Sequence, residues 1–124
     1  MASKMLSTIR PVEFPLGPGW TLSNCSLTSI HPQDADSFIN DLSGGSVWHS
    51  FFSEDLLWAE NYMLGTILSV GWYPECDPDG EYVLRHKEVV SDEPNQPDWY
   101  RMLRLVRTRS TTDLFQTIES ILRN

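Results

Sequence analysis

The side chains that could do nucleophilic, acid–base or metal chemistry in this sequence are few. The histidines are His31, His49 and His86, and the cysteines are Cys25 and Cys76. Structural zinc sites need such ligands in closely spaced pairs, and the sequence has neither a Cys-x-x-Cys nor a His-x-x-x-His pair. A phosphate-binding loop and a Gly-x-Ser-x-Gly elbow are absent as well. The sequence therefore predicts no catalytic residue, no metal site and no cofactor, and we expect both cysteines to be free thiols.

Each histidine also has an ordinary structural interpretation. His31 precedes a predicted helix as a polar cap, His49 belongs to an aromatic stretch that packs or faces solvent, and His86 is a surface residue of a predicted strand. One alternative stays open, because a Cys–His or Glu–His pair can form in three dimensions without any sequence motif. In that alternative the chain is a small enzyme or ligand-binding domain that uses His49, His86 or Cys76.

The acidic run from Asp77 to Glu81, Asp-Pro-Asp-Gly-Glu, has some of the residue types of a calcium loop. An EF-hand loop, however, places its oxygen ligands at fixed positions between two helices. That spacing is absent here, and the flanking residues predict strands. We therefore interpret the run as a structural turn.

Charge is distributed unevenly along the chain, whose net charge is −8. No Lys or Arg occurs between Arg10 and Arg85, and this stretch holds eleven acidic residues. The C-terminal part reverses the sign with a short run of arginines: Arg101, Arg104, Arg107 and Arg109. These arginines have mixed strand parity and do not all share one face, so ion pairing with nearby acids explains them better than a nucleic-acid surface does. An acidic chain of this kind repels nucleic acid and anionic membranes and favours a basic protein partner.

Acidic residues and large aromatic residues occur together in two stretches, 54–62 and 72–82. Aromatic anchors surrounded by charge are typical of protein interfaces, and complementary charge speeds the encounter with a basic partner. The candidate partner-binding residues are Glu54, Asp55, Trp58, Glu60, Glu75, Asp77, Asp79 and Glu81.

Hydrophobic periodicity and turn residues predict the elements that must position these side chains. They are a strand over 20–30, a helix over 32–42, an irregular helical stretch over 46–63, strands over 64–73, 81–90 and 99–107, and a helix from 110. Pro74, Pro78 and Gly80 make the connection between two of the strands a tight hairpin. Ser110 and Asp113 resemble a capping box at the start of the last helix.

This order predicts an α+β fold, an antiparallel meander sheet with two to three helices packed on one face. We expect residues 1–124 to form a single globular domain, with about the first ten residues loose. No run approaches the roughly 20 apolar residues of a membrane helix. The N-terminus lacks the apolar core of a secretory signal, so we expect a cytoplasmic protein with no membrane partner.

The run from Gly71 to Leu84, Gly-Trp-Tyr-Pro-Glu-Cys-Asp-Pro-Asp-Gly-Glu-Tyr-Val-Leu, is similar to the hairpin of small bacterial immunity proteins. The segment Phe-Ile-Asn-Asp-Leu over 38–42 and the helix start at Arg109-Ser110 are similar to theirs as well. The resemblance covers roughly residues 38 to 122. It implies a cytosolic protein that binds one cognate toxin domain of a contact-dependent or polymorphic toxin system and blocks it. It implies no catalytic residues.

Two functions therefore compete with the immunity protein at this stage. One is the small enzyme or ligand-binding domain described above. The other is an adaptor subunit, a homodimer formed through strand edges or through the aromatic stretch.

Overall fold

The computed structural model describes residues 10–37, 47–90 and 100–123. Along the chain its elements are β1 (Trp20–Cys25), η2 (Pro32–Ser37), α1 (Val47–Phe51), β2 (Leu57–Asn61), β3 (Thr66–Tyr73), β4 (Glu81–Val89), β5 (Tyr100–Thr108) and α2 (Thr111–Leu122). The expected α+β class is confirmed.

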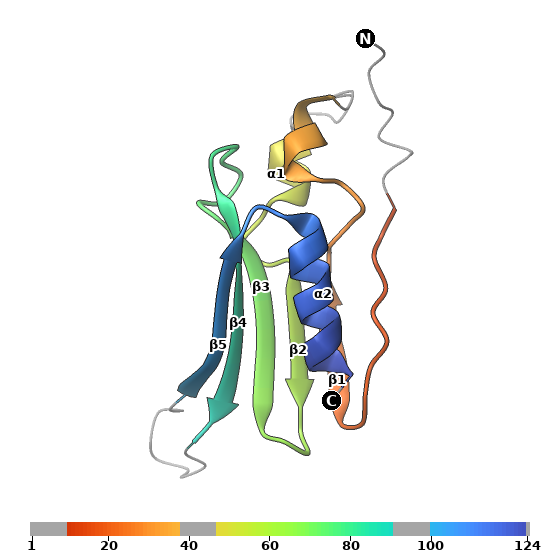
Figure 1. The fold of residues 1–124 in the computed structure, drawn as a ribbon, viewed down its shortest axis with the longest axis vertical. Helices are drawn as coiled ribbons and strands as arrows, with labels where there is room; N and C mark the ends of the chain where they lie inside the picture. The colour runs from red at the N-terminus through yellow and green to blue at the C-terminus, as the bar shows by residue number, and fades with distance from the viewer. Residues whose placement is uncertain (1–9, 38–46, 91–99, 124) are drawn as a thin grey trace.

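The strands form one five-stranded antiparallel sheet whose spatial order, β1-β2-β3-β4-β5, is also their order in the sequence (Figure 1). The hairpin between β3 and β4 has the predicted position, and Tyr73 pairs with Glu81 at its base. The predicted meander is therefore confirmed, and β5 forms one edge of the sheet.

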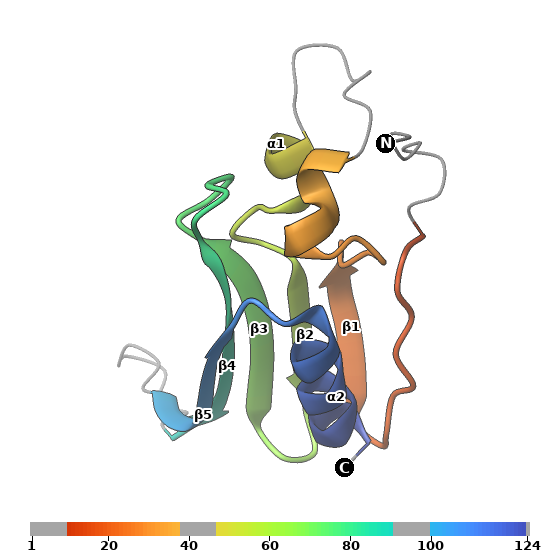
Figure 2. The same ribbon diagram turned by 45° about the horizontal axis from the view of Figure 1, so that its top comes forward.

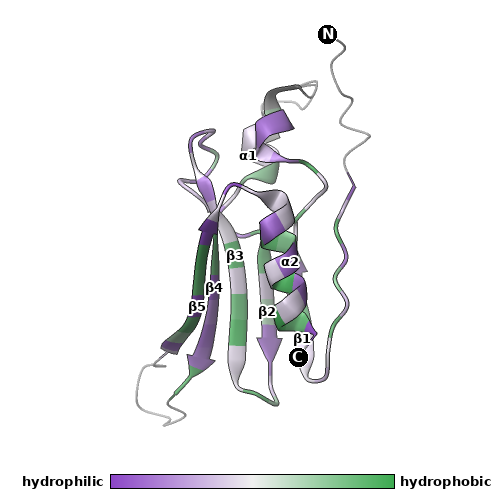
Figure 3. Ribbon diagram, viewed as in Figure 1, coloured by the Kyte–Doolittle hydropathy of each residue, from purple (hydrophilic) through white to green (hydrophobic). Residues whose placement is uncertain are grey.

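Helix α2 covers one face of the sheet (Figures 1 and 2), which we call the covered face. Its apolar stripe is buried at Leu114, Ile118 and Leu122. Ser110 caps the helix, because its hydroxyl accepts a hydrogen bond of 3.1 Å from the Asp113 backbone N–H. Figure 3 shows apolar bands along β3, which lies beside α2 in this view. The opposite face, which we call the open face, has no helix over it among the described residues.

Large aromatic residues fill the core at the end of the sheet where α1 lies. The Trp72 ring is fully buried, with its centre 4.8 Å from Phe52, 5.0 Å from Tyr82 and 5.7 Å from Trp48. The edge-on contacts of Trp72 with Phe52 and Tyr82 add to the free energy that burial already contributes. This cluster joins α1 to β3 and β4 and gives that end of the sheet a fixed shape.

The helical interpretation of residues 46–63 is wrong beyond Phe51. Residues Leu57–Asn61 form strand β2, in which buried and exposed residues alternate strictly. Leu57 and Ala59 lie in the core, whereas Trp58 and Glu60 lie on the open face. The adjacent apolar residues before this segment hide its period of two, and pairing with both β1 and β3 decides the conformation.

The expected two to three helices on one face reduce to one in the described part of the chain. The five-residue α1 and the 3-10 turn η2 lie at one end of the sheet (Figure 2). The predicted helix over 32–42 begins as η2, and its residues 38–42 lie outside the described residues. Both segments are too short to build an apolar stripe that could cover the sheet. The first nine residues, expected to be loose, also lie outside the described residues.

A β-bulge interrupts the pairing of β4 with β5. Arg85 pairs with Leu105 and Lys87 pairs with Met102, so β5 carries one extra residue between them. Tyr100 and Met102 therefore share the open face with Leu105, although strict alternation predicts that Leu105 lies on the face opposite to theirs.

No helix within the described ranges is long and apolar enough to cross a membrane.

Candidate functional site

Six of the eight candidate residues gather at the end of the sheet where β3 ends and β4 begins. We call this group the acidic end: Glu54, Asp55, Glu75, Asp77, Asp79 and Glu81. Two loops carry it, residues 53–56 before β2 and residues 74–80 between β3 and β4. The chain therefore brings together acids that are up to 27 positions apart in the sequence.

Hydrogen bonds tie each of the two loops to a residue of the buried aromatic cluster. The Trp72 N–H donates to the Ser53 carbonyl at 2.9 Å, and the Cys76 N–H donates to the Phe52 carbonyl at 2.8 Å. The Trp72 indole N–H also donates to the Asp77 carbonyl at 2.7 Å. The acidic end is thus fixed to the buried aromatic cluster rather than attached by a loose hairpin.

Arg109 fastens the same hairpin from the C-terminal side. Its guanidinium donates to the carbonyls of Gly80 and Pro78, the latter at 3.0 Å, and lies 5.4 Å from the centre of the Trp72 ring. A side chain at Gly80 would come within 2.5 Å of the Trp72 indole nitrogen. Sequence reasoning placed Arg109 in the basic run and missed this role, which depends on contacts between distant segments.

The six carboxylates of the acidic end have different surroundings. Asp77 accepts a 2.8 Å hydrogen bond from the Asp79 backbone N–H, and Glu81 lies 3.9 Å from Arg107. The predicted turn at this run is confirmed. Glu54, Asp55 and Glu75 are exposed, as is Asp79. Four carboxylates can therefore bind a charged partner without breaking the hydrogen bonds that hold the hairpin.

The predicted pairing of the arginine run with nearby acids is confirmed at two positions. Arg101 contacts Glu88 at 2.6 Å, and Arg107 contacts Glu81 at the distance given above. All these side chains are at least one-third exposed, so each pair contributes little stability. Their main effect is to neutralise part of the charge of Glu81 at the acidic end and of Glu88 at the other end of β4.

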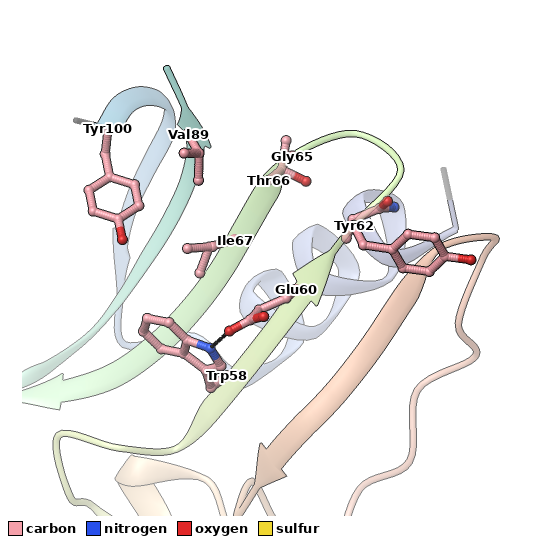
Figure 4. A pocket seen from close by; sticks show the side chains of 9 residues that line it. Trp58, Glu60, Tyr62, Gly65, Thr66, Ile67, Val89 and Tyr100 are labelled. Carbon is pink, nitrogen blue, oxygen red and sulfur yellow. Dashed lines mark hydrogen bonds between the residues drawn. The ribbon is translucent and has the colours of Figure 1, made fainter. Parts of the chain in front are cut away.

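The other two candidate residues, Trp58 and Glu60, are carried onto the open face by β2. There they belong to a pocket of about 350 Å³ (Figure 4), which we call the open-face pocket. Its lining residues are Trp58, Glu60, Asn61, Tyr62, Gly65, Thr66, Ile67, Val89 and Tyr100. The pocket lies about six strand positions, roughly 20 Å, from the acidic end along β3.

Aromatic rings and one carboxylate define the open-face pocket. The Trp58 indole N–H donates to Glu60 Oε1 at 2.9 Å, which fixes the carboxylate beside the ring (Figure 4). Trp58 is 38% exposed and Tyr100 is 45% exposed, so both rings remain accessible. Lys87 places its ammonium 5.4 Å from the centre of the Tyr100 ring. Sequence reasoning missed Val89, which a hydrogen bond places beside Gly65, and Tyr100, which the β-bulge turns onto the open face next to Val89.

The remaining chemically active side chains are dispersed. His86 pairs with Leu68 and lies about 17 Å along β4 from the base of the loop that carries Cys76. It is only partly exposed, with its Nε2 atom buried, rather than the surface residue that we expected. Burial and the nearby Arg104 charge lower the pKa of His86. The structure therefore does not bring His86 and Cys76 together, and the side chain of His49 lies outside the described atoms.

The cysteines are free thiols, as expected. Burial raises the pKa of the Cys25 thiol, and burial together with the Glu75 carboxylate raises that of Cys76. A raised pKa keeps a thiol protonated and poorly nucleophilic at neutral pH. Within the described ranges, no group of three or more His, Cys, Asp or Glu side chains could hold a metal ion.

Known proteins provide no assignment for this arrangement of residues. No protein-family model, no curated protein and no solved structure matches the chain.

Proposed function

We propose that this protein is an immunity-type inhibitor that binds a basic toxin domain directly through its acidic end. The observation that carries the proposal is the group of four exposed carboxylates on two loops, each of which is hydrogen-bonded to a residue of the buried aromatic cluster. The resemblance of residues 71–84 to the hairpin of immunity proteins covers one of these loops.

Electrostatics supports a basic protein as the partner. Like charges held close together on a small protein create a local negative potential that steers a positive partner toward them. The chain carries a net charge of −8, so the field of the whole molecule has the same sign as that of the acidic end. Arg109 lies against the carbonyls of Pro78 and Gly80 and offsets part of this field, but the six carboxylates of the acidic end outnumber the two arginines beside them, Arg107 and Arg109.

Rigidity supports tight binding as well as fast encounter. Ordering a loop at the moment of association costs free energy, and a loop that is already ordered avoids this cost. The hydrogen bonds from Trp72 and Arg109 fix the hairpin before any partner arrives. An inhibitor that must hold a lethal enzyme inactive benefits from both properties.

The test is capture of the product of the neighbouring toxin gene by the tagged protein, followed by charge reversal. Glu54→Lys, Glu75→Lys and Asp79→Lys are the variants of choice, because these side chains are exposed and take no part in holding the hairpin. Asp77 is left unchanged, since its carboxylate accepts the Asp79 N–H. The matched control is Glu13→Lys, which makes the same charge change at an exposed site outside both loops.

We expect a stoichiometric complex with the unmodified protein and with Glu13→Lys. Each single reversal should slow association more than Glu13→Lys does, and the three together should slow it at least about tenfold, because rim charges act chiefly on the association rate. The triple reversal should also abolish protection of cells that express the toxin domain. Failure to recover a basic domain, or association rates of the single reversals equal to that of Glu13→Lys, would refute the proposal.

A further inference from the structure

We infer that the open-face pocket is a guanidinium site that receives an arginine side chain of the protein partner. The site lies outside the acidic end and is argued from its own geometry. Only the identity of the arginine donor rests on the proposed function, because a basic toxin domain would supply it.

The walls of the pocket suit a flat cation. Trp58 and Tyr100 stand on opposite sides of it, with Ile67 between them (Figure 4). Cations bind favourably over the faces of such rings, and the indole ring is the strongest of them. Guanidinium is planar and weakly hydrated, so it loses less than an ammonium group when it enters a partly apolar pocket.

Glu60 supplies the opposite charge at the same place. One of its oxygens accepts the Trp58 indole N–H, which positions the carboxylate within the pocket. Within the described residues no side chain forms a salt bridge with Glu60, so its negative charge is not neutralised there. A carboxylate accepts two parallel N–H bonds from a guanidinium, a geometry that ammonium cannot offer.

Lys87 shows that this surface already holds a cation. Its ammonium lies 5.4 Å from the centre of the Tyr100 ring and comes from β4, next to Ile67 on β3. Lys87 does not line the pocket itself. It therefore competes for the Tyr100 ring and repels an incoming cation, so that removing its charge should strengthen binding.

The rim of the pocket explains why a protein side chain, rather than a free small cation, is the occupant. Tyr62, Met63 and Leu64 form the β2–β3 turn beside it and are 81%, 63% and 57% exposed. Three consecutive exposed apolar residues are costly in water and are typical of surfaces that bury against another protein. An arginine on a partner surface would enter the pocket while that surface covered the turn.

The experiment is a titration of the full-length ¹⁵N-labelled protein with N-acetyl-arginine methylamide, monitored by the indole N–H signal of Trp58. The matched neutral probe is the citrulline derivative, which has the same shape without the charge. We expect the arginine probe to shift the Trp58 signal in a saturable way and the citrulline probe to bind at least about tenfold more weakly, a difference of about 1.4 kcal/mol.

Two variants assign the binding to the pocket. Glu60→Gln keeps an oxygen for the Trp58 N–H and removes only the charge, so the fold should persist while arginine binding weakens about tenfold. Glu13→Gln is the matched control and should leave the affinity unchanged. Lys87→Met should tighten binding about two- to threefold.

Equal binding of the arginine and citrulline probes, no saturable shift, or an unchanged affinity in Glu60→Gln would overturn the assignment. Equal binding of N-acetyl-lysine methylamide would overturn the preference for guanidinium. The two proposals can fail separately. If the toxin complex forms but the pocket does not bind arginine, this inference alone is refuted. If the pocket binds arginine but no toxin complex forms, the proposed function alone is refuted.

Discussion

The acidic end and the open-face pocket each place a tryptophan beside acidic groups, but one tryptophan is buried and supports a loop, whereas the other is exposed and lines a pocket. Trp72 is fully buried, and its indole N–H holds the backbone of the acidic hairpin at the Asp77 carbonyl. Trp58 is 38% exposed, and its indole N–H holds the side chain of Glu60. In the first region the ring supports acids that act at long range. In the second the ring is itself a binding surface and the acid acts on contact.

Truncation of the two tryptophans should give the largest difference in stability between the two regions. Trp72→Ala should lower the free energy of unfolding by about 3–5 kcal/mol, because it leaves a cavity beside Phe52 and Tyr82 and frees the hairpin. Trp58→Ala removes a partly exposed ring and should cost far less, about 0.5 kcal/mol. Urea denaturation of both variants checks this, and equal losses would contradict the division between supporting and binding ring.

Trp72→Phe separates packing from hydrogen bonding in the same experiment. It retains an aromatic ring in the core but loses the donor to the Asp77 carbonyl. The loss should include about 0.5–1.5 kcal/mol for this one hydrogen bond, because the Asp77 carbonyl still accepts the Gly80 N–H.

Raising the salt concentration should have the next largest effect, and it should weaken binding at the two regions to different extents. The Debye length falls from about 30 Å at about 0.01 M salt to about 3 Å at about 1 M. Association through the acidic end should therefore slow by at least about tenfold over this range, since exposed charges act through the solvent. Arginine binding in the pocket should weaken less, because part of its free energy comes from ring contact. Stopped-flow association and the arginine titration measure the two, and equal salt dependence would argue against two mechanisms.

Acid should have the smallest effect, and it should act on the fold rather than on either region. Burial, followed by the charge of Arg104, lowers the pKa of His86 below its ordinary value of 6.5. The unfolded chain therefore takes up the proton more readily. The stability that His86 contributes is complete above about pH 6.5 and is lost as the pH falls through its lowered pKa.

The non-titrating variant His86→Gln isolates this effect. Between pH 7 and pH 5 the unmodified protein should lose more unfolding free energy than the variant, because all other groups titrate alike in both. Denaturation at the two pH values checks it. An equal loss in both proteins would show that His86 does not contribute.

The parts of the fold that could be predicted are those that local pattern determines. Alternation located β3 and β4, Pro and Gly located the turn between them, and the cap at Ser110 located α2. Residues 57–61 were misjudged because three apolar residues in a row, Leu56, Leu57 and Trp58, mask the period of two. Their strand conformation is imposed by two neighbouring strands and not by their own sequence.

The candidate site shows the same limit. The sequence identified the acids of the hairpin and their turn, because both lie in one short segment. It grouped Trp58 with Glu54, although the structure assigns them to different surfaces. The contribution of Tyr100 depends on a bulge that changes strand parity, and that of Arg109 depends on a contact across 29 residues. Neither the bulge nor the Arg109 contact can be predicted from the spacing of residues that are close in the sequence.

The bulge in β5 also affects the tendency of the protein to associate through the free edge of its sheet at high concentration. An edge strand of nine residues is a template for stacking copies of a chain into fibrils. Here the bulge interrupts the regular ladder, and Arg101, Arg104 and Arg107 would place like charges together if two β5 edges met. Both features oppose edge-to-edge growth. The same strand that completes the open-face pocket therefore also disfavours pairing of its free edge with that of another copy.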